Sequence, residues 1–290
     1  MYGIFKLKTV TTLLLVTIIA ISLAYLFSVH KSEITSAPIK EEAHVPIIMY
    51  HSVLKDPART GEYVITPDML RSDFEYLKKH GYTAVSASEL ISYVHDGTPL
   101  PEKPVMITFD DGFLNNIEYA LPLLREYSMC AVISVVGAYC DVYTNEPDRN
   151  LYYSYMTWDD VRDAEELLEI EIASHSYDMH SQYPRRGASQ MDGEDDSRYK
   201  AVFRADVESM KSALLKNSGI DCRIYTYPLG AVSEGSRDIL RGAGVLMSLS
   251  CYEHINTLKM GEHDCLYELG RFNRSGLVST DEFMAKAKIE

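Results

Sequence analysis

The sequence predicts an α/β fold: an irregular (β/α) barrel of seven or eight parallel strands, preceded by one N-terminal transmembrane helix. Apolar strand-like runs alternate with amphipathic helix-like runs along most of the chain. Most links between them are short, which favours parallel strands joined by right-handed crossovers. Seven or eight such units favour a barrel over an open sheet. A long uncharged run precedes all of them.

That N-terminal run covers residues 9–29 and follows Lys6 and Lys8. It is about as long as a helix needs to be to cross a bilayer, roughly 20 residues, and the lysines favour a cytoplasmic N-terminus. We therefore expect a signal anchor in the cell membrane, with residues 1–8 inside and the catalytic domain outside. A cleaved export signal, giving a secreted protein, is the alternative, and a buried core helix fits less well.

Residues 30–43 are polar and predict a tether, so that the domain covers residues 44–290. The net charge of −14 argues against nucleic acid as a partner, because phosphate recognition needs clustered Lys and Arg. Five cysteines permit two disulfides, with Cys251 and Cys265 as the most plausible pair.

The expected strands are rich in apolar and β-branched residues. They cover residues 45–50, 82–85, 105–109, 131–136, 170–174, 224–227, 245–250 and 267–272. The clearest helix begins at Thr66–Pro67, a cap followed by proline at the first helical position, and ends at Gly81. The other helices are expected near 88–94, 115–127, 157–168, up to about 216, near 236–241 and from 280.

The strand 105–109 ends at two adjacent carboxylates, Asp110 and Asp111, followed by Gly112. Burying an unpaired charge is costly, so these acids belong at a mouth where water, a metal or a substrate meets them. Functional groups gather at the C-terminal ends of parallel strands. Both acids could instead cap the next helix, but two acids followed by glycine favour the functional interpretation.

A second polar stretch, with His175 and His180, follows the strand 170–174. Their spacing does not place them on one helix face, so they would converge through a strand end or loop. Asp178, between them, would orient a ring N–H or be a solvated loop residue. One Asp and two His suit Zn²⁺ or another divalent first-row metal. Spacing alone leaves a metal site and an incidental pair equally open.

With these residues the chain resembles the polysaccharide deacetylase (NodB-like carbohydrate esterase) family. The resemblance spans roughly residues 44–275 and rests on two motifs that are specific together, Thr108–Gly112 and His175-Ser176-x-x-x-His180. Weaker matches indicate the extracellular poly-N-acetylglucosamine deacetylase-like branch: Met49–His51, Thr157–Asp159 and Tyr225–Gly230.

The resemblance implies metal-dependent removal of acetyl groups from an N-acetylated amino-sugar polymer, such as poly-N-acetylglucosamine, peptidoglycan or a chitin-like chain. Asp111, His175 and His180 would hold the metal, Zn²⁺ or else Co²⁺, Ni²⁺ or Mn²⁺. Asp110 would be the general base. Adjacent residues of an extended chain face opposite ways, so these two roles need a local twist after Phe109.

The family also implies a backbone N–H after a proline as the oxyanion donor, here that of Leu229 after Pro228. Any residue except proline supplies this donor. The family arginine two residues before that proline is Thr226 here. Arg271 is the expected replacement that orients Asp110, unless it is an ordinary surface arginine.

His51, at the end of the first strand, is expected to be the general acid for the leaving amine, because relatives with this N-terminal stretch have a rearranged motif order. It would otherwise be a packed strand-end histidine. His254 and His263 lie in the right part of the chain but in no matching motif. Tyr50 and Trp158 would form apolar walls for a sugar or belong to the core.

Two other functions remain open: an O-acetyl esterase acting on xylan or a related glycan, and a catalytically silent carbohydrate-binding domain. The complete Asp/Asp/His/His set argues against the second, because a binder needs no base beside a metal. The expected partners are an acetylated amino-sugar polysaccharide or oligosaccharide and, through the N-terminal helix, the membrane.

Overall fold

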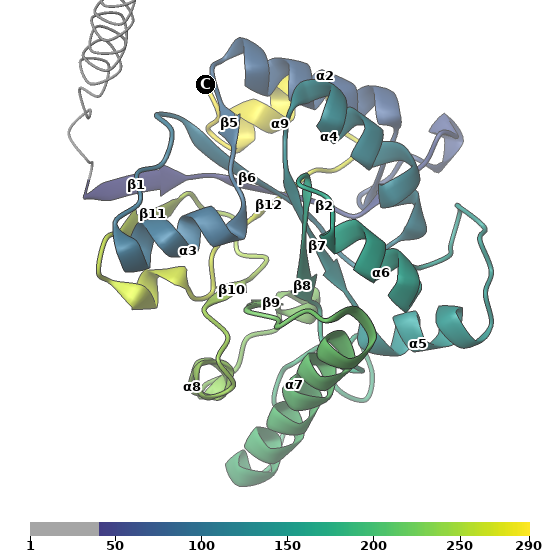
Figure 1. The fold of residues 1–290 in the computed structure, drawn as a ribbon, viewed down its shortest axis with the longest axis vertical. Coiled ribbons are helices and arrows are strands. Elements are labelled where there is room, and N and C mark those ends of the chain that lie inside the picture. Colours follow the sequence, from purple (N-terminus) through teal and green to yellow (C-terminus); the bar gives the residue numbers. More distant parts are fainter. Residues whose placement is uncertain (1–40) are drawn as a thin grey trace, which may run out of the picture. The chain divides into compact units, whose positions relative to one another are not determined.

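A sheet of parallel strands forms the centre of the molecule. The computed structural model describes residues 41–290, and Figure 1 shows the strands side by side with helices around them. The strand order is β10-β9-β8-β7-β6-β2-β12, and β5 pairs with β6 off this path. The bounds are β2 Ile47–Tyr50, β5 Thr83–Ala84, β6 Pro104–Phe109, β7 Ala131–Val135, β8 Ile170–Ser174, β9 Ile224–Thr226, β10 Met247–Leu249 and β12 Phe272–Asn273.

One segment of chain, residues 269–274, contains β12 at one end of this strand order and also contacts the chain beside β10 at the other end. The Ser250 N–H donates to the carbonyl oxygen of Leu269 at 2.8 Å, beside β10. The Arg274 N–H donates to the carbonyl oxygen of Met49 at 2.9 Å, on β2. The sheet is therefore strongly curled. The predicted α/β fold of parallel strands is confirmed, while the predicted barrel is a curled sheet in which β10 and β12 do not pair.

The predicted N-terminal helix, residues 9–29, lies outside the described residues, as do residues 1–8 and most of the predicted tether. Within residues 41–290, no helix is both long enough and apolar enough to cross a membrane. A short strand, β1 (Glu42–Val45), begins before the predicted domain start and pairs antiparallel with β11 (Asn256–Lys259).

Several helices begin at a residue whose side chain caps the first turn. Thr66 accepts a hydrogen bond from the Met69 N–H at the start of α2, as the sequence predicted. Capping boxes in which a side chain and the third helical residue satisfy each other's backbone start α3, α6 and α9. The bounds are α2 Pro67–Lys79, α3 Ala87–Asp96, α4 Leu121–Tyr127, α5 Gly137–Asn145, α6 Trp158–Glu165, α7 Asp196–Ser218, α8 Ser236–Gly242 and α9 Thr280–Lys286.

The short strands β1, β3 (Ser52–Val53), β4 (Val64–Ile65) and β11 were not predicted, and three other elements differ from the prediction. The helix expected at 115–127 is divided into a π-helical turn (Asn116–Ala120) and α4, because Pro122 has no N–H to continue the regular pattern. The helix α5 was not predicted, since it buries only Gly137 and Cys140 and has no apolar stripe. The last strand is shortened to β12, because Glu268 has a φ of 60°.

The interior of the curled sheet changes from apolar to polar toward the C-terminal ends of the strands. Successive residues of a strand face opposite ways, so Met106, Thr108 and Asp110 lie on one face. Met106 belongs to an apolar cluster with β2, β7 and α3 residues. Beyond it, the hydroxyl groups of Ser134 and Thr226 are 2.7 Å apart. This polar layer forms the floor of the site described below.

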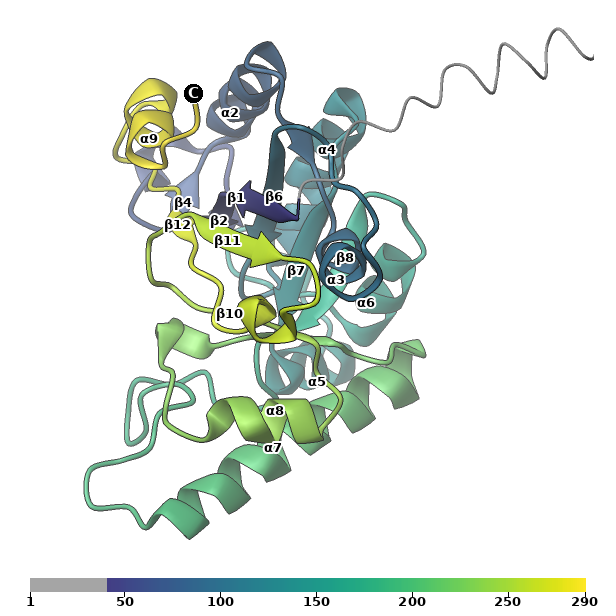
Figure 2. The same ribbon diagram turned by 90° about the vertical axis from the view of Figure 1, so that its left-hand side faces the viewer.

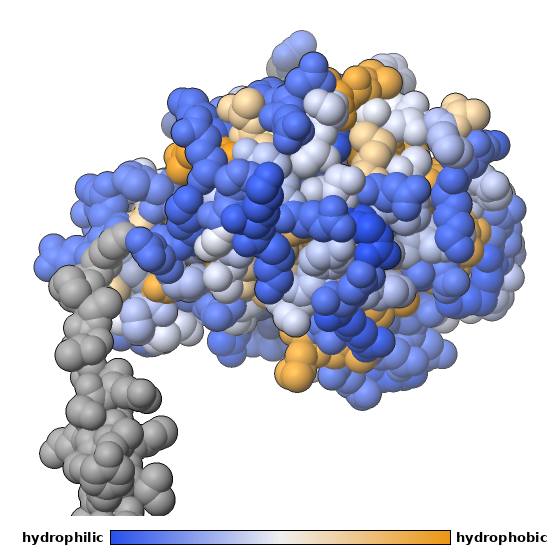
Figure 3. All heavy atoms as spheres, turned by 90° about the horizontal axis from the view of Figure 1, so that it is seen from above, coloured by the Kyte–Doolittle hydropathy of each residue, from blue (hydrophilic) through white to orange (hydrophobic). Residues whose placement is uncertain are grey.

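The other face of the sheet packs against α2, α4, α6 and α9 through a second apolar cluster. A third cluster lies between α7, α8 and β9, and Figure 2 shows α7 and α8 side by side below the sheet. The surface seen from above, in Figure 3, is mostly hydrophilic, with apolar side chains in small separate patches.

Candidate active site

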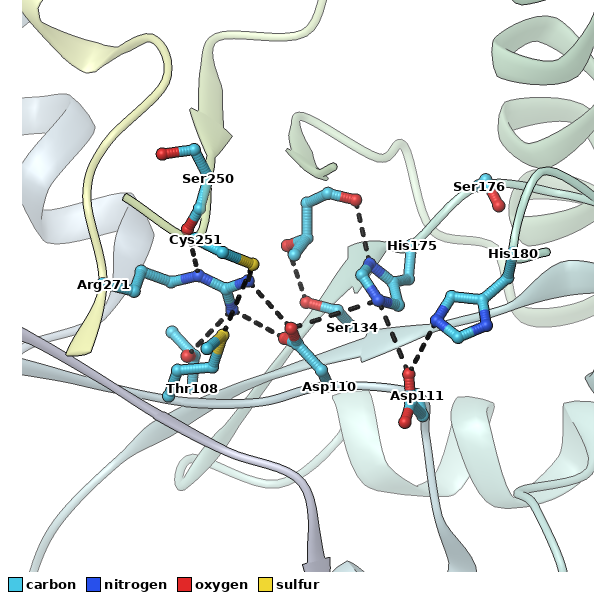
Figure 4. Close-up of polar contacts among 12 residues, drawn as sticks. Thr108, Asp110, Asp111, Ser134, His175, Ser176, His180, Ser250, Cys251 and Arg271 are labelled. Atoms are coloured by element: carbon cyan, nitrogen blue, oxygen red, sulfur yellow. Dashed lines mark hydrogen bonds and ion pairs between the residues drawn. The ribbon is translucent and has the colours of Figure 1, made fainter. Parts of the chain in front are cut away.

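Asp110 and Asp111 diverge at the end of β6. The Asp110 N–H still donates to the carbonyl oxygen of Tyr50, at 2.9 Å, whereas Asp111 has a φ of 72° and turns the chain. At Gly112 a Cβ atom would lie 2.8 Å from Cγ1 of Val135, so only glycine fits there. Figure 4 shows the result: the Asp110 carboxylate points toward Arg271, and that of Asp111 points toward the two histidines.

Arg271 and Asp110 form a bidentate ion pair buried from solvent. The two terminal nitrogens of Arg271 lie 2.6 Å and 2.8 Å from the two carboxylate oxygens, and Nε donates to the carbonyl oxygen of Ser250 at 2.9 Å. Arg271 is completely buried, which rules out the surface alternative. Burial would raise the pKa of Asp110, but Arg271 and then His175 outweigh it and hold that pKa below its usual value. Asp110 is therefore an ionised carboxylate.

Asp111, His175 and His180 converge from the ends of β6 and β8. One ligand atom of each lies within 4.8 Å of the others. Oδ1 of Asp111 is 3.0 Å from Nε2 of His180 and 3.5 Å from Nε2 of His175. Two imidazole nitrogens and one carboxylate suit a divalent first-row metal and leave coordination positions for water and substrate.

The imidazole of His175 is oriented as a metal ligand would be. Its Nδ1 lies 2.9 Å from the carbonyl oxygen of Thr226. Because a carbonyl only accepts, Nδ1 carries a proton, and Nε2 is left as the atom that faces Asp111 and can bind a metal. An N–H held by a backbone carbonyl is the usual support of a ligating histidine. The donor set and its support thus both fit a metal.

The turn that carries His180 is fixed by two helices. A carboxylate on α7, Asp206, accepts hydrogen bonds from the backbone N–H groups of Tyr177 and Asp178, at 2.9 Å and 2.8 Å. The first two N–H groups of α5 donate to the carbonyl oxygens of Ser176 and Tyr177. Asp178 itself is exposed, as the solvated alternative expected.

The sequence prediction did not identify Asp206. A signal was present, because Asp206 lies on the face of α7 that also carries Phe203, Val207 and Met210, all of them buried. An acid on the apolar face of a helix needs a specific partner. Two tyrosines that flank the metal ligands, Tyr139 and Tyr155, were also missed. Their ring centroids are 4.5 Å apart, and both belong to a Tyr-rich stretch in which no helix or strand was predicted.

His51 lies beside this site at the end of β2. Its ring packs edge-on against Tyr63 at 4.8 Å, and its buried Nδ1 has no hydrogen-bond partner among residues 41–290. Burial lowers the pKa of His51, although Asp110 and Asp111 act in the opposite direction. An unpaired buried nitrogen costs about 1–3 kcal/mol, so His51 is not the fully hydrogen-bonded packed histidine of the alternative prediction.

Leu229 lies in a tight turn, Pro228–Gly230, at the end of β9. It is a non-glycine residue with a φ of 56°, a strained conformation of the kind found at functional sites. Arg186 donates to its carbonyl oxygen at 2.9 Å. Three residues before Leu229, the Thr226 carbonyl holds His175, so one short stretch supports both a metal ligand and the expected oxyanion donor.

Tyr50 and Trp158 do not reach the site. Tyr50 is completely buried and donates its hydroxyl hydrogen to Asp73 at 3.1 Å. Trp158 is almost completely buried, and its Nε1 donates to Asp141 at 2.7 Å. Both belong to the core, which leaves neither as a wall for a sugar.

The expected pairing of Cys251 with Cys265 is also not found, and all five cysteines are free. Sγ of Cys251 lies 3.7 Å from the guanidinium of Arg271, at the edge of the site. Cys265 lies elsewhere, beside the backbone of Lys259.

Comparison with known proteins gives one consistent family. A family model described as polysaccharide deacetylase matches residues 97–248. The poly-β-1,6-N-acetyl-D-glucosamine N-deacetylase of Escherichia coli strain K12 is 29% identical over 141 residues, 46% of this chain and 20% of that protein. The enzyme of the same name from Staphylococcus epidermidis is 22% identical over 211 residues, 72% of this chain and 68% of that protein. The match thus spans only about a fifth of the E. coli relative.

Two solved structures have a similar fold. A de-N-acetylase from Aggregatibacter actinomycetemcomitans superposes with a TM-score of 0.69 at 25% identity, covering 83% of this chain and all of that one. IcaB from Ammonifex degensii gives a TM-score of 0.66 at 22% identity, covering 84% and 96%. The second likeness shows the shared fold.

Proposed function

This chain belongs to the polysaccharide deacetylase family, and from that premise we propose that it hydrolyses acetamide groups of an N-acetylated amino-sugar polymer with the help of a divalent metal. One observation carries the proposal: at the end of β6, Asp111 joins two histidines while Asp110 pairs with Arg271. The names of the E. coli and S. epidermidis relatives support a polymer of the poly-N-acetylglucosamine kind.

Asp111, His175 and His180 would hold the metal, and Zn²⁺ suits this donor set. A bound metal would lower the pKa of a water molecule and polarise the acetyl carbonyl. Asp110 takes the proton from the attacking water, because it is ionised and lies next to Asp111. Arg271 keeps the carboxylate ionised and fixes its direction.

Leu229 and His51 complete the reaction. The Leu229 N–H would donate to the oxygen that gains negative charge as the tetrahedral intermediate forms. His51, in its protonated form, would then deliver a proton to the nitrogen of the leaving amine; the carboxylates of Asp110 and Asp111 favour the charged ring, whereas burial opposes it. The products are acetate and a free amino sugar.

An O-acetyl esterase would use the same groups, so the substrate distinguishes the two enzymes. A silent carbohydrate-binding domain is disfavoured, because a buried ion pair such as Asp110–Arg271 costs desolvation that binding alone does not require.

We also propose that the domain works outside the cell, tethered through residues 9–29, whose uncharged sequence supports a membrane anchor. Protease added to intact cells should then degrade the domain, and protection from the protease would contradict this location.

The test is acetate release from N-acetylglucosamine oligomers, with and without a chelator, for the parent and Asp110→Asn. Chelation should abolish release and added metal should restore it. Asp110→Asn should bind metal as the parent does, yet lose a factor of about 10²–10⁴ in rate, the usual contribution of a general base.

Acetylated xylan serves as the comparison substrate and should release much less acetate than the N-acetylated oligomers. A rate for Asp110→Asn equal to that of the parent would remove Asp110 from its role. Faster release from xylan would replace the amidase by an esterase.

A further inference from the structure

A second hollow opens on the same rim as the site. It has a volume of about 400 Å³ and lies between residues 232–237, Tyr252 and Glu268. None of the residues placed in the reaction above lines it. Its volume lies within the range of small-molecule sites, and its lining is mostly polar.

The hollow adjoins the site through two direct contacts. A Cβ atom at Gly230 would lie 2.7 Å from Cβ of Cys251, so the turn carrying Leu229 rests on Cys251. Sγ of Cys251 in turn lies 3.7 Å from Arg271. The hollow begins two residues after Gly230, at Val232, and one residue after Cys251, at Tyr252. A polymer lying across Leu229 would therefore continue into it.

Tyr252 gives this hollow a rigid aromatic wall. Its side chain is 63% exposed, while its backbone is held on both sides. Its N–H donates to the hydroxyl oxygen of Ser250 at 3.4 Å, and its carbonyl oxygen accepts from the Arg271 N–H at 3.0 Å. An exposed tyrosine on a fixed backbone offers a large amphipathic surface at small entropic cost.

Glu268 supplies an oriented polar group. Arg237 donates to Oε1 of Glu268 from Nε and Nη2, at 3.0 Å and 2.9 Å. Its other oxygen, Oε2, has no partner within residues 41–290. Glu268 has a φ of 60°, a conformation that the surrounding structure must enforce, and its N–H donates to Ser248. Glu234 adds a second, exposed carboxylate.

We propose that this hollow is a subsite for a second sugar unit of the polymer, a proposal that rests on the function proposed above. The ring of Tyr252 packs against the apolar face of that sugar. Glu268, held by Arg237, accepts hydrogen bonds from its hydroxyl groups, and Glu234 does the same from the rim. The enzyme thus prefers chains over single units.

The first test compares kcat/KM for the dimer and the pentamer of N-acetylglucosamine. Tyr252→Ala should lower the pentamer-to-dimer ratio about tenfold, mostly through a higher KM for the pentamer, because a binding contact is lost. Tyr252→Phe keeps the ring and should preserve the ratio. Leu168→Ala removes a side chain that is 99% exposed between α6 and β8, and it should match the parent.

The second test is calorimetric titration of the pentamer into the metal-free protein. The parent should bind the pentamer more tightly than the dimer, and Tyr252→Ala should lose this difference. An unchanged ratio and an unchanged affinity in Tyr252→Ala would overturn the subsite while leaving the proposed activity intact. If the parent released no acetate at all, the proposed function would fail, and this titration would still decide the subsite.

Discussion

Among single side chains, Arg271 determines what Asp110 can do. Asp110 is buried, and in isolation its carboxylate would hold a proton and could not serve as a base. The two parallel hydrogen bonds from Arg271 keep the Asp110 carboxylate ionised and hold it toward Arg271 instead of toward the metal ligands. The two residues are 161 positions apart, and the sequence suggested their pairing only through the family resemblance, which left the place of an orienting arginine to be filled.

Arg271→Lys should therefore shift the acidic limb of the pH–rate profile. Lysine retains the charge but not the planar fork, so the pKa of Asp110 rises. The ionised base is then lost at a higher pH as acid is added, and the limb moves upward. The measurement is kcat/KM against pH, and a limb that stays in place would separate Arg271 from the base.

Arg271→Met removes the charge as well and should destabilise the fold by about 3–5 kcal/mol, the usual cost of leaving a buried charge unpaired. Combining it with Asp110→Asn should recover much of that loss in urea unfolding. Strict additivity of the two changes would mean that the pair is not coupled.

Among the elements, α7 has a role that its position outside the sheet does not suggest. It lies beside α8 in Figure 2, yet Asp206 on its buried face holds the turn between the two histidine ligands. The motif His175-Ser176-x-x-x-His180 could be predicted from the sequence, whereas the group that gives it a fixed shape could not. Asp206 follows that motif at a distance and carries no pattern of its own except an acid on an apolar face.

Asp206→Ala should weaken zinc binding about 10–100-fold, the usual effect of removing a group that orients metal ligands. Asp206→Asn keeps one acceptor oxygen and should lose less. Affinity is measured by calorimetric titration of the metal-free protein. Glu208→Ala, an exposed acid on the same helix, is the matched control, and equal affinity in Asp206→Ala and Glu208→Ala would contradict the role.

Across the whole molecule, a buried polar network joins distant parts of the chain. Asp73 on α2 pairs with Arg274 at 2.8 Å and 3.1 Å, and both side chains are fully buried. Asp73 also accepts from Tyr50 and from Thr280 at the start of α9. The network connects the C-terminal segment to α2 and β2.

Asp73→Asn should lower the midpoint of thermal unfolding, because Arg274 would remain buried without its counter-charge. The rate of acetate release per folded molecule should stay that of the parent, since the side chains of the network contact none of the reacting side chains. A lower rate with unchanged stability would place this network in the reaction instead of in the fold.

Much of this architecture could be predicted, because strand and helix periods are local. Seven of the eight expected strands lie close to their predicted ranges, and Thr66 starts α2 as its type and position indicated. The last strand could not be predicted as it stands, because the turn at Glu268 depends on Ser248 and Arg237, which are distant in sequence. The pairing of β1 with β11 has the same long-range origin.

The turn at Asp111 limits which insertions and deletions this part of the chain can accept. Two residues, and only two, lie between the end of β6 and Gly112, whose Cα sits against Val135. An inserted residue would rotate one carboxylate away from its partner, and a deletion would leave a single acid to meet either Arg271 or the histidines. Substitutions can be tolerated around this point, but changes of length cannot. The role of each aspartate is thus set by its distance from the end of β6: the first residue handles the proton, and the second binds the metal.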